Sequence, residues 1–269
     1  MEKELTGRTA IITGGSRGIG RAIAIALAKN GVCVIICGRN QGTLQQTIEE
    51  INKSNWCSPT LRCEYRVVDV MQPGQIEKIF IEPPENIDIL VNNVGGAEKF
   101  GDFFTLTDKD WLNAFNLNLM SMVRFCRLAI PLLKKSPSPR IINISSLVAR
   151  QPGRFNPHYG TAKTGMLYLN KYLANELARY GILVNAICPS TIEGGGWEKN
   201  IRDRANRTGM SLEEAEAAMK SEEVAKSPLG RMGQLKDVAE LVVFLASEKA
   251  NFITGQVFDV DGGVRRSIY

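Results

Sequence analysis

The sequence predicts a doubly wound α/β fold, in which one parallel sheet of seven strands carries helices on both faces. Seven short apolar runs alternate with helix-like segments along the 269 residues. A glycine-rich turn connects the first strand to the first helix, and polar residues follow several strands directly. No linker divides the chain, so we expect residues 1–269 to form a single domain.

The first unit is a strand, a glycine-rich turn, a helix and a second strand. The strand Thr9–Thr13 leads into the turn, a helix follows over residues 21–29, and Gly31 ends it before a strand at 32–37. The turn itself reads Gly14-Gly15-Ser16-Arg17-Gly18-Ile19-Gly20. Glycines there let the backbone approach a pyrophosphate lying on the amides at a helix N-terminus. No Gly-Lys-Ser/Thr closes the turn, so we predict a dinucleotide site rather than a P-loop.

The alternation continues to the end of the chain. The expected strands span residues 65–69, 87–91, 140–144, 183–188 and 257–260, and the expected helices 41–53, 73–80, 108–133, 157–180 and 236–246. Pro83-Pro84 ends the short second helix of this series, and Thr107 is the expected N-cap of the long one. Ligands bind at the carboxyl ends of such strands. We therefore expect one crevice to collect the residues that follow strands, namely Gly14, Asp69, Asn93, Ser146 and Pro189.

Tyr159 and Lys163 stand four residues apart on an expected helix and so share one face. A free tyrosine has a pKa near ~10, and a neighbouring ammonium group favours the phenolate and lowers that pKa. The phenol then becomes a usable proton donor or acceptor at neutral pH. Ser145-Ser146, thirteen positions before the tyrosine, offers a hydroxyl for a carbonyl oxygen. His158 points about 100° away from Tyr159 on a helix, so we expect it to take no part.

Composition excludes several classes of protein. A formal charge of +5 without a basic run disfavours nucleic acid, although such a surface suits anionic small molecules or an acidic carrier protein. No apolar stretch approaches the ~20 residues of a membrane span, and nothing resembles a signal peptide. Six scattered cysteines lack metal-ligand spacing. We expect a reduced, cytoplasmic protein without disulfides or a metal site.

One segment departs in composition, at residues 193–226. It begins with Gly194-Gly195-Gly196-Trp197 and continues into a charge-rich helix from Ser211, where Ser211 and Glu214 match a capping box. Glycines beside a tryptophan above the expected crevice indicate a mobile lid that supplies an apolar wall for the substrate. A solvated excursion explains the composition equally well.

The chain resembles the short-chain dehydrogenase/reductase superfamily over nearly its whole length, and within it the 3-oxoacyl-(acyl carrier protein) reductase-like group. The fold is then of Rossmann type. The resemblance rests on Thr13-Gly14-x3-Gly18-Ile19-Gly20, Asn92-Asn93-Val94-Gly95, Asn118, Ser146, Tyr159-x3-Lys163 and Asp261-Gly262-Gly263.

The resemblance implies roles for four catalytic residues. Tyr159 would be the acid in reduction and the base in oxidation, and Ser146 rather than Ser145 would orient the substrate oxygen. Lys163 would hold the nicotinamide ribose hydroxyls and depress the pKa of the tyrosine. Asn118, seven positions after Trp111, would hold a water that passes protons to the lysine.

The resemblance also implies a cofactor site. NAD-binding members carry an acid after the second strand, where this chain has Gly38-Arg39-Asn40. Arg39 and Arg17 could grip a 2′-phosphate there, so NADP(H) is preferred over NAD(H). The whole expected cofactor site comprises Gly14, Ser16, Arg17, Gly18, Ile19, Gly20, Arg39, Asp69, Val70, Asn93, Gly95, Tyr159, Lys163 and Ile192.

Asp69 has two possible roles in that site, and the segment after the sixth strand departs from the family's sequence pattern. Asp69 would border the adenine together with Val70, or it would act as a helix cap. The family's Pro-Gly after the sixth strand is Pro189-Ser190 here. The nicotinamide amide would therefore be held by the Ile192 backbone and Thr191.

The leading hypothesis is an NADPH-dependent reductase that turns a ketone, 3-oxoacyl thioester-like or other, into a secondary alcohol. The substrate would be a small carbonyl or alcohol molecule, free or bound to a carrier protein. An alcohol or cyclic-diol dehydrogenase working in the oxidative direction is the alternative, and a non-catalytic dinucleotide-binding sensor is a third. The group commonly forms tetramers, here through residues 107–133, 157–180 and 236–260, and a dimer is the other expectation. Substrate selectivity would lie in the lid and in the loop 97–105.

Overall fold

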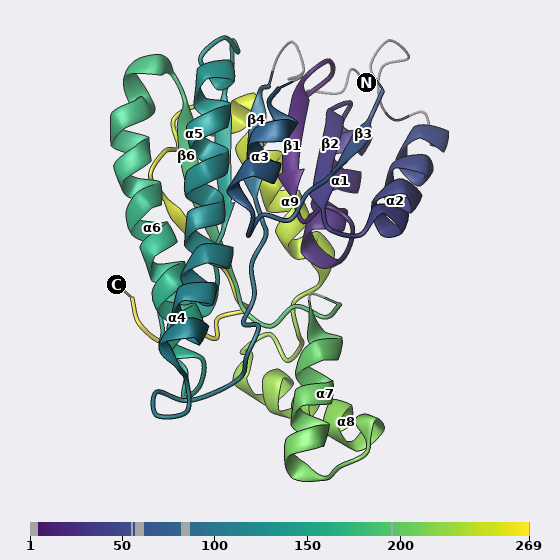
Figure 1. Cartoon of the computed structure of the whole chain (residues 1–269), viewed down its shortest axis with the longest axis vertical. Helices are drawn as coiled ribbons and strands as arrows, with labels where there is room; N and C mark the ends of the chain where they lie inside the picture. Colours follow the sequence, from purple (N-terminus) through teal and green to yellow (C-terminus); the bar gives the residue numbers. More distant parts are fainter. Residues whose placement is uncertain (1–4, 55, 57–61, 82–86, 195, 269) are drawn as a thin grey trace.

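A single seven-stranded sheet forms the centre of the molecule (Figure 1). The computed structural model describes residues 5–54, 56, 62–81, 87–194 and 196–268. Every pair of neighbouring strands is parallel, and the order is β3-β2-β1-β4-β5-β6-β7. The strands are β1 Thr9–Thr13, β2 Cys33–Gly38, β3 Glu64–Val67, β4 Ile89–Asn92, β5 Arg140–Ile144, β6 Leu183–Pro189 and β7 Val257–Val260. The strand order reverses between β1 and β4, which places a ligand crevice at their carboxyl ends.

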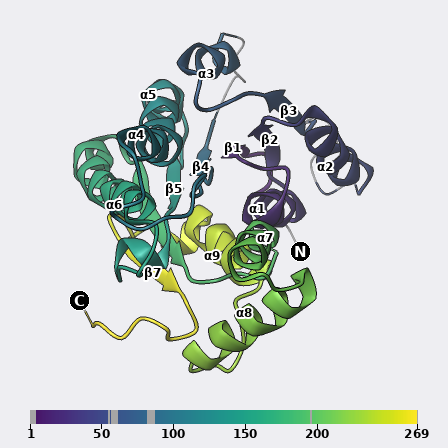
Figure 2. The ribbon, with the colours of Figure 1, turned by 60° about the horizontal axis from the view of Figure 1, so that its bottom comes forward.

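Helices cover both faces of this sheet, which confirms the predicted fold class (Figure 2). α1 (Gly18–Lys29), α2 (Gln41–Lys53) and α9 (Leu235–Ala246) pack on one face. α3 (Pro73–Ile79), α5 (Ser121–Leu133) and α6 (Pro157–Leu177) pack on the other. The apolar strand residues alternate between the two cores: Ala10 and Ile12 of β1 face the first, and Ile11 faces the second. Burial on both sides explains why these strands are continuous apolar runs.

Three helical segments differ from the prediction. The expected helix 108–133 is α4 (Asp108–Phe115) and α5 joined by a π-helical stretch, Asn116–Met120, and the expected Thr107 cap is confirmed as a capping box. α6 ends at Leu177 and continues as a 3₁₀ turn. α7 (Trp197–Thr208) was not predicted as a helix, because its sequence is polar and begins next to glycines.

The segment 193–226 extends beyond the carboxyl edge of the sheet. It forms α7 and α8 (Leu212–Lys226), which stand apart from the helices that flank the strands (Figure 1). Ile201 and Ala205 of α7 pack on Ala215 of α8 in a small apolar core of their own, together with Met232. The predicted capping box of Ser211 and Glu214 is confirmed at the start of α8.

Four residues that the sequence analysis mentions, Cys57, Pro83, Pro84 and Gly195, lie outside the described residues. The five described cysteines are buried. Within the described part of the chain, no group of histidine, cysteine, aspartate or glutamate side chains is arranged to hold a metal ion. None of the described helices has both the length and the apolar character needed to cross a lipid bilayer.

Candidate active site

The glycine turn between β1 and α1 makes a close-fitting backbone cradle. Gly14 and Gly18 have φ of 70° and 52°, a region that favours glycine. A Cβ on Gly20 would lie 2.8 Å from the Gly14 carbonyl carbon and 2.5 Å from Asn93 Nδ2. The turn therefore packs directly against the first turn of α1, whose unpaired N–H groups attract anions. No acidic residue lies in that first turn to oppose a phosphate.

Two arginines flank this cradle without an acidic partner. Ser16 Oγ would be 3.6 Å from a Cβ on Gly38, so the turn touches the end of β2, where Arg39 follows. Arg17 and Arg39 are exposed, and within the described residues neither makes an ion pair. Asn40 caps α2 by accepting a hydrogen bond from the Thr43 N–H at 3.0 Å. A positively charged notch is thus present at the place where the expected 2′-phosphate would sit.

The end of β4 is tied to the end of β1 by side-chain hydrogen bonds. Thr13 Oγ1 accepts from the N–H groups of Asn93 and Val94 at 2.9 and 3.0 Å. Asn93 Nδ2 donates to the Thr13 carbonyl at 2.9 Å. These bonds hold the chain that follows β4, including Gly95, beside the glycine turn.

Asn118 lies in the π-helical stretch and is completely buried. Its Oδ1 accepts from the Gly96 N–H at 2.9 Å, and its Nδ2 donates to the carbonyls of Gly96 and Ala114 at 3.0 and 2.8 Å. A Cβ on Gly95 would lie 2.6 Å from both Asn118 Oδ1 and Lys163 Nζ, so only glycine fits there. π-Helical turns often occur at functional sites. The Asn118 side chain thus fixes the loop after β4 against the lysine.

Ser146, Tyr159 and Lys163 come together where β5 and α6 meet. Ser146 follows β5, and its side chain is hydrogen-bonded with the Tyr159 phenol. Lys163 Nζ lies 5.9 Å from the centre of the Tyr159 ring and donates to the Ile144 carbonyl at 2.8 Å. Ser145 Oγ donates to the Lys163 carbonyl at 3.1 Å, which commits it to α6. The predicted preference for Ser146 over Ser145 agrees with this geometry.

Burial dominates the titration of the tyrosine and the lysine. It raises the pKa of Tyr159, and the hydrogen bond with Ser146 opposes that rise. Burial also lowers the pKa of Lys163 to about 8. The prediction that Lys163 lowers the pKa of Tyr159 is therefore wrong for this arrangement. The lysine ammonium bonds to a main-chain carbonyl instead of the phenol, and low-dielectric surroundings penalise both charged forms.

Thr191 and Ile192 follow β6 and enter the lid segment. Thr191 Oγ1 donates to Glu223 of α8 at 2.6 Å, so its hydroxyl is not directed to a nicotinamide as expected. Ile192 forms an isolated parallel bridge with Gly233, in which the Thr191 carbonyl and the Glu193 N–H make the hydrogen bonds. No hydrogen bond in the described structure uses the Ile192 N–H or carbonyl, which leaves its backbone available.

The Asp69 carboxylate caps its own turn. Asp69 Oδ1 accepts from the Met71 N–H at 3.0 Å, which supports the capping alternative, although the cap lies in the turn before α3. Val70 is buried in the core, and its carbonyl accepts from Arg124 Nη1 at 3.3 Å.

His158 is buried beside Trp111 rather than open to the crevice. The two rings are 6.2 Å apart in an edge-to-face arrangement, and His158 Nδ1 has no hydrogen-bond partner. Burial lowers its pKa, which keeps the imidazole neutral. Its role is to pack the start of α6 against α4.

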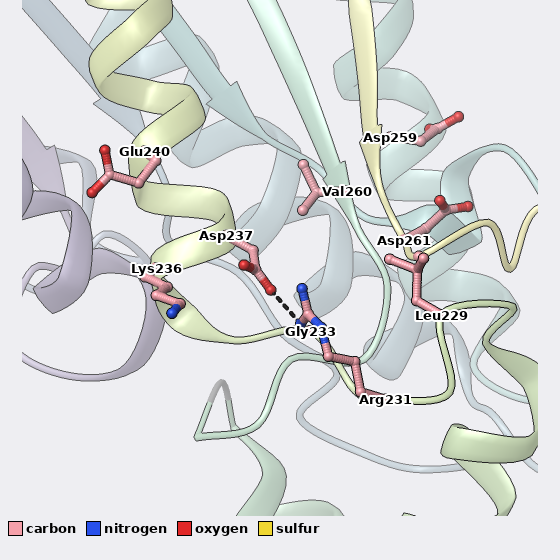
Figure 3. A pocket seen from close by; sticks show the side chains of 10 residues that line it. Leu229, Arg231, Gly233, Lys236, Asp237, Glu240, Asp259, Val260 and Asp261 are labelled. Atoms are coloured by element: carbon pink, nitrogen blue, oxygen red, sulfur yellow. Dashed lines mark hydrogen bonds and ion pairs between the residues drawn. The ribbon is translucent and has the colours of Figure 1, made fainter.

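A hollow of about 480 Å³ lies elsewhere, between the start of α9 and the end of β7 (Figure 3). Its walls carry mixed charges, including an ion pair of Arg231 and Asp237 at 2.7 Å. Neither Ser146, Tyr159 nor Lys163 lines it. It is therefore separate from the crevice at the end of β1, β4 and β5.

Sequence reasoning did not predict the contacts among four residues, although the expected lid contains Lys199 and Arg207 and the expected selectivity loop 97–105 contains Phe100. Lys199 and Arg207 of α7 contact the loop after β4, where Phe100 lies against Phe155. Nothing in the local sequence pairs these positions, because they come from three separate segments.

The comparisons with known proteins agree with this geometry. A family model described as "Enoyl-(Acyl carrier protein) reductase" matches residues 14–265. The chain is 35% identical over 269 residues to the 3-oxoacyl-[acyl-carrier-protein] reductase FabG of Aquifex aeolicus (strain VF5), covering 98% of this chain and 100% of that one. It is 36% identical over 264 residues to a tropinone reductase homolog of Arabidopsis thaliana, covering 96% and 90%. The crystal structure of L-sorbose reductase from Gluconobacter frateurii, complexed with NADPH and L-sorbose, superposes with a TM-score of 0.91 at 28% identity over all of both chains.

Proposed function

The chain belongs to the short-chain dehydrogenase/reductase superfamily and resembles its 3-oxoacyl-(acyl carrier protein) reductases, and on this premise we propose that it reduces a ketone to a secondary alcohol with NADPH. It is an NAD(P)-dependent oxidoreductase that acts on carbonyl and CH–OH groups. One observation carries the finer proposal. Ser146, Tyr159 and Lys163 gather at the carboxyl edge of the sheet, where Gly95 packs on Lys163.

The residues present fit a dinucleotide. A Cβ would clash at Gly20, and Gly14 and Gly18 have a positive φ, so this glycine cradle would hold the pyrophosphate at the start of α1. Lys163 would hold the nicotinamide ribose, and the Ile192 backbone the carboxamide. The bound nicotinamide supplies the hydride.

Tyr159 then acts as the general acid. Its phenol donates a proton to the carbonyl oxygen of the substrate while Ser146 donates a hydrogen bond to the same oxygen. A raised pKa keeps the phenol protonated at neutral pH, which suits reduction. A positioned acid of this kind contributes roughly 10²–10⁴ in rate. Lys163 would hold the ribose hydroxyls of the bound cofactor and supply the proton that restores Tyr159. A water held at Asn118 would in turn supply a proton to the lysine.

The preference for NADPH over NADH rests on Arg17 and Arg39. Both are exposed and lack acidic partners in the described structure, so a 2′-phosphate would gain their hydrogen bonds without breaking others. Charge-assisted hydrogen bonds are worth about 1.5–3 kcal/mol each. Solved structures with NADPH among similar proteins support this preference.

The substrate is a small carbonyl compound, free or bound to a carrier protein. Similar proteins act on both kinds: 3-oxoacyl-[acyl-carrier-protein] reductases on the one hand and an L-sorbose reductase on the other. Residues 193–226 would form the lid of one catalytic domain that spans 1–269. We further propose a cytoplasmic homotetramer, with a homodimer as the alternative. Exposed Leu112, Tyr168 and Tyr172 on α4 and α6 support pairing through those helices.

Oxidation of an alcohol or cyclic diol is the alternative function, because the same residues catalyse the reverse step. A panel of β-ketoacyl thioesters, cyclic ketones and quinones assayed with NADPH and with NADH tests the proposal. Faster reduction of at least one ketone with NADPH is expected. Turnover only with NADP⁺ or NAD⁺ and an alcohol would favour the oxidative alternative. Cofactor binding without any turnover would favour a dinucleotide sensor.

A further inference from the structure

Helix α7 is fastened at both ends to the loop that follows β4. Near its start, Lys199 Nζ donates to the carbonyls of Ala97 and Glu98 at 2.6 and 2.8 Å. Near its end, the Arg207 guanidinium lies 4.8 Å from the centre of the Phe100 ring. The two attachment points are eight residues apart, so the helix runs alongside residues 97–100 for about 12 Å. This arrangement holds α7 against the loop that follows β4.

The ring under Arg207 belongs to an aromatic pair beside the catalytic helix. Phe100 and Phe155 have ring centres 4.7 Å apart, although they come from the loops after β4 and β5. Asn156 joins these loops: its N–H donates to the Gly101 carbonyl at 2.7 Å, and its Oδ1 accepts from the Gly101 N–H at 3.1 Å. Phe155 stands four residues before Tyr159. The pair is therefore fixed close to the general acid.

Two guanidinium groups lie on this aromatic pair. Arg207 is 5.4 Å and Arg154 is 5.6 Å from the centre of the Phe155 ring. Within the described residues, neither arginine makes an ion pair. Asp102 is the acid that the Arg154 charge affects: hydrogen bonds from Thr105 are the main reason why its pKa is lowered, and the Arg154 guanidinium adds to that effect without forming an ion pair in the described structure.

Stacking on a ring uses the face of a guanidinium and leaves its N–H groups at the edge free. Such an edge matches the two oxygens of a carboxylate or phosphoryl group in bidentate geometry. Arg154 and Arg207 come from different segments and lie 5.6 and 5.4 Å from the centre of one ring, so both add positive charge around Phe155. The Lys199 ammonium, which bonds only to carbonyls, adds positive charge along the same side of α7.

We infer that Arg207 and Arg154, held on the Phe100–Phe155 pair, form a subsite for an anionic substituent of the substrate, a carboxylate or a phosphoryl group set some bonds away from the reacting ketone. This inference rests on the proposed function and narrows its substrate class.

Matched ketones test the subsite. Levulinate and its methyl ester differ by a carboxylate charge, and acetoacetyl phosphopantetheine and acetoacetyl pantetheine differ by a distant phosphate. We expect kcat/KM to favour at least one anionic ketone over its neutral partner by ten- to hundredfold, mostly through KM. Which pair shows the preference distinguishes a carboxylate from a phosphate ligand.

Arginine variants assign the preference. Arg207→Ala should reduce the anionic preference to less than threefold, and Arg207→Lys should restore part of it. Arg202→Ala is the control, since Arg202 is an exposed arginine on the same helix. An equal rate for charged and neutral ketones in the wild-type enzyme would overturn the inference, as would a preference that survives Arg207→Ala.

A binding measurement separates this inference from the proposed function. If no ketone is reduced, the proposed function fails, but calorimetric titration of levulinate and of phosphopantetheine into the NADP⁺-loaded protein still tests the subsite. At least tenfold weaker binding of one of them to Arg207→Ala than to wild type is expected. Equal affinity of both variants for both anions would refute it.

Discussion

Replacing Gly20 by alanine tests the backbone cradle of the proposed cofactor site. The new Cβ would lie 2.8 Å from the Gly14 carbonyl carbon, against about 3.4 Å for an ordinary contact, and closer still to the carbonyl oxygen. The glycine turn and α1 must therefore separate by more than half an ångström. Overpacking of this kind costs about 1–3 kcal/mol in unfolding free energy. The same displacement moves the amides that would bind the pyrophosphate. Each loss of about 1.4 kcal/mol in the binding free energy of the cofactor weakens its affinity tenfold.

We expect Gly20→Ala to raise the Kd for NADPH about tenfold to hundredfold, measured by quenching of protein fluorescence, and to lower the free energy of unfolding in urea. Gly74→Ala is the matched control, because a Cβ on Gly74 in α3 meets nothing within 4 Å. It should leave the Kd unchanged. NADPH binding by Gly20→Ala with wild-type affinity would show that the cofactor does not lie on this turn.

Three further outcomes follow from the site. Arg39→Ala should raise the KM for NADPH about ten- to hundredfold and that for NADH less than threefold, and equal effects in steady-state assays would remove the phosphate argument. Because burial raises the pKa of Tyr159, kcat/KM for ketone reduction should stay constant through neutral pH and decrease only in the alkaline range, where kcat/KM for alcohol oxidation should increase. A decrease of kcat/KM for reduction as the pH rises from acid to neutral would contradict this prediction. The pKa of Lys163 falls to about 8 in the folded protein from 10.5. Below pH 8 both states hold the proton and the burial cost is fully present. Between about pH 8 and pH 10.5 the unfolded state binds more protons than the folded state, so the unfolding free energy of the wild type should rise with pH relative to that of Lys163→Met. Urea unfolding at several pH values measures this difference, and parallel plots of unfolding free energy against pH would refute the prediction.

The positions of the main elements were predictable because periodicity and glycine placement are local. The helix Gln41–Lys53 and the strand Arg140–Ile144 occur where the sequence indicated. Asn93 is hydrogen-bonded to Thr13 at the end of β1, and Ser146 lies with Tyr159 at the end of β5. Parallel strands end at a common edge, so residues that follow them meet without any knowledge of side-chain contacts.

Features set by tertiary contact were not predictable. The π-helical stretch around Asn118 depends on the hydrogen bonds of that side chain to Gly96, far along the chain. The pKa of Tyr159 depends on burial, which pairwise spacing with Lys163 does not reveal. Helix α7 has a polar sequence, and its placement depends on Lys199 and Arg207 finding partners in a distant loop.

The account depends most on Tyr159 as the proton donor. Tyr159→Phe should reduce single-turnover reduction of the best ketone by at least a hundredfold while the Kd for NADPH stays within a few-fold, because the ring remains and only the hydroxyl is lost. Tyr168→Phe, on the exposed side of the same helix, should behave as wild type. Wild-type turnover by Tyr159→Phe would contradict the proposed chemistry.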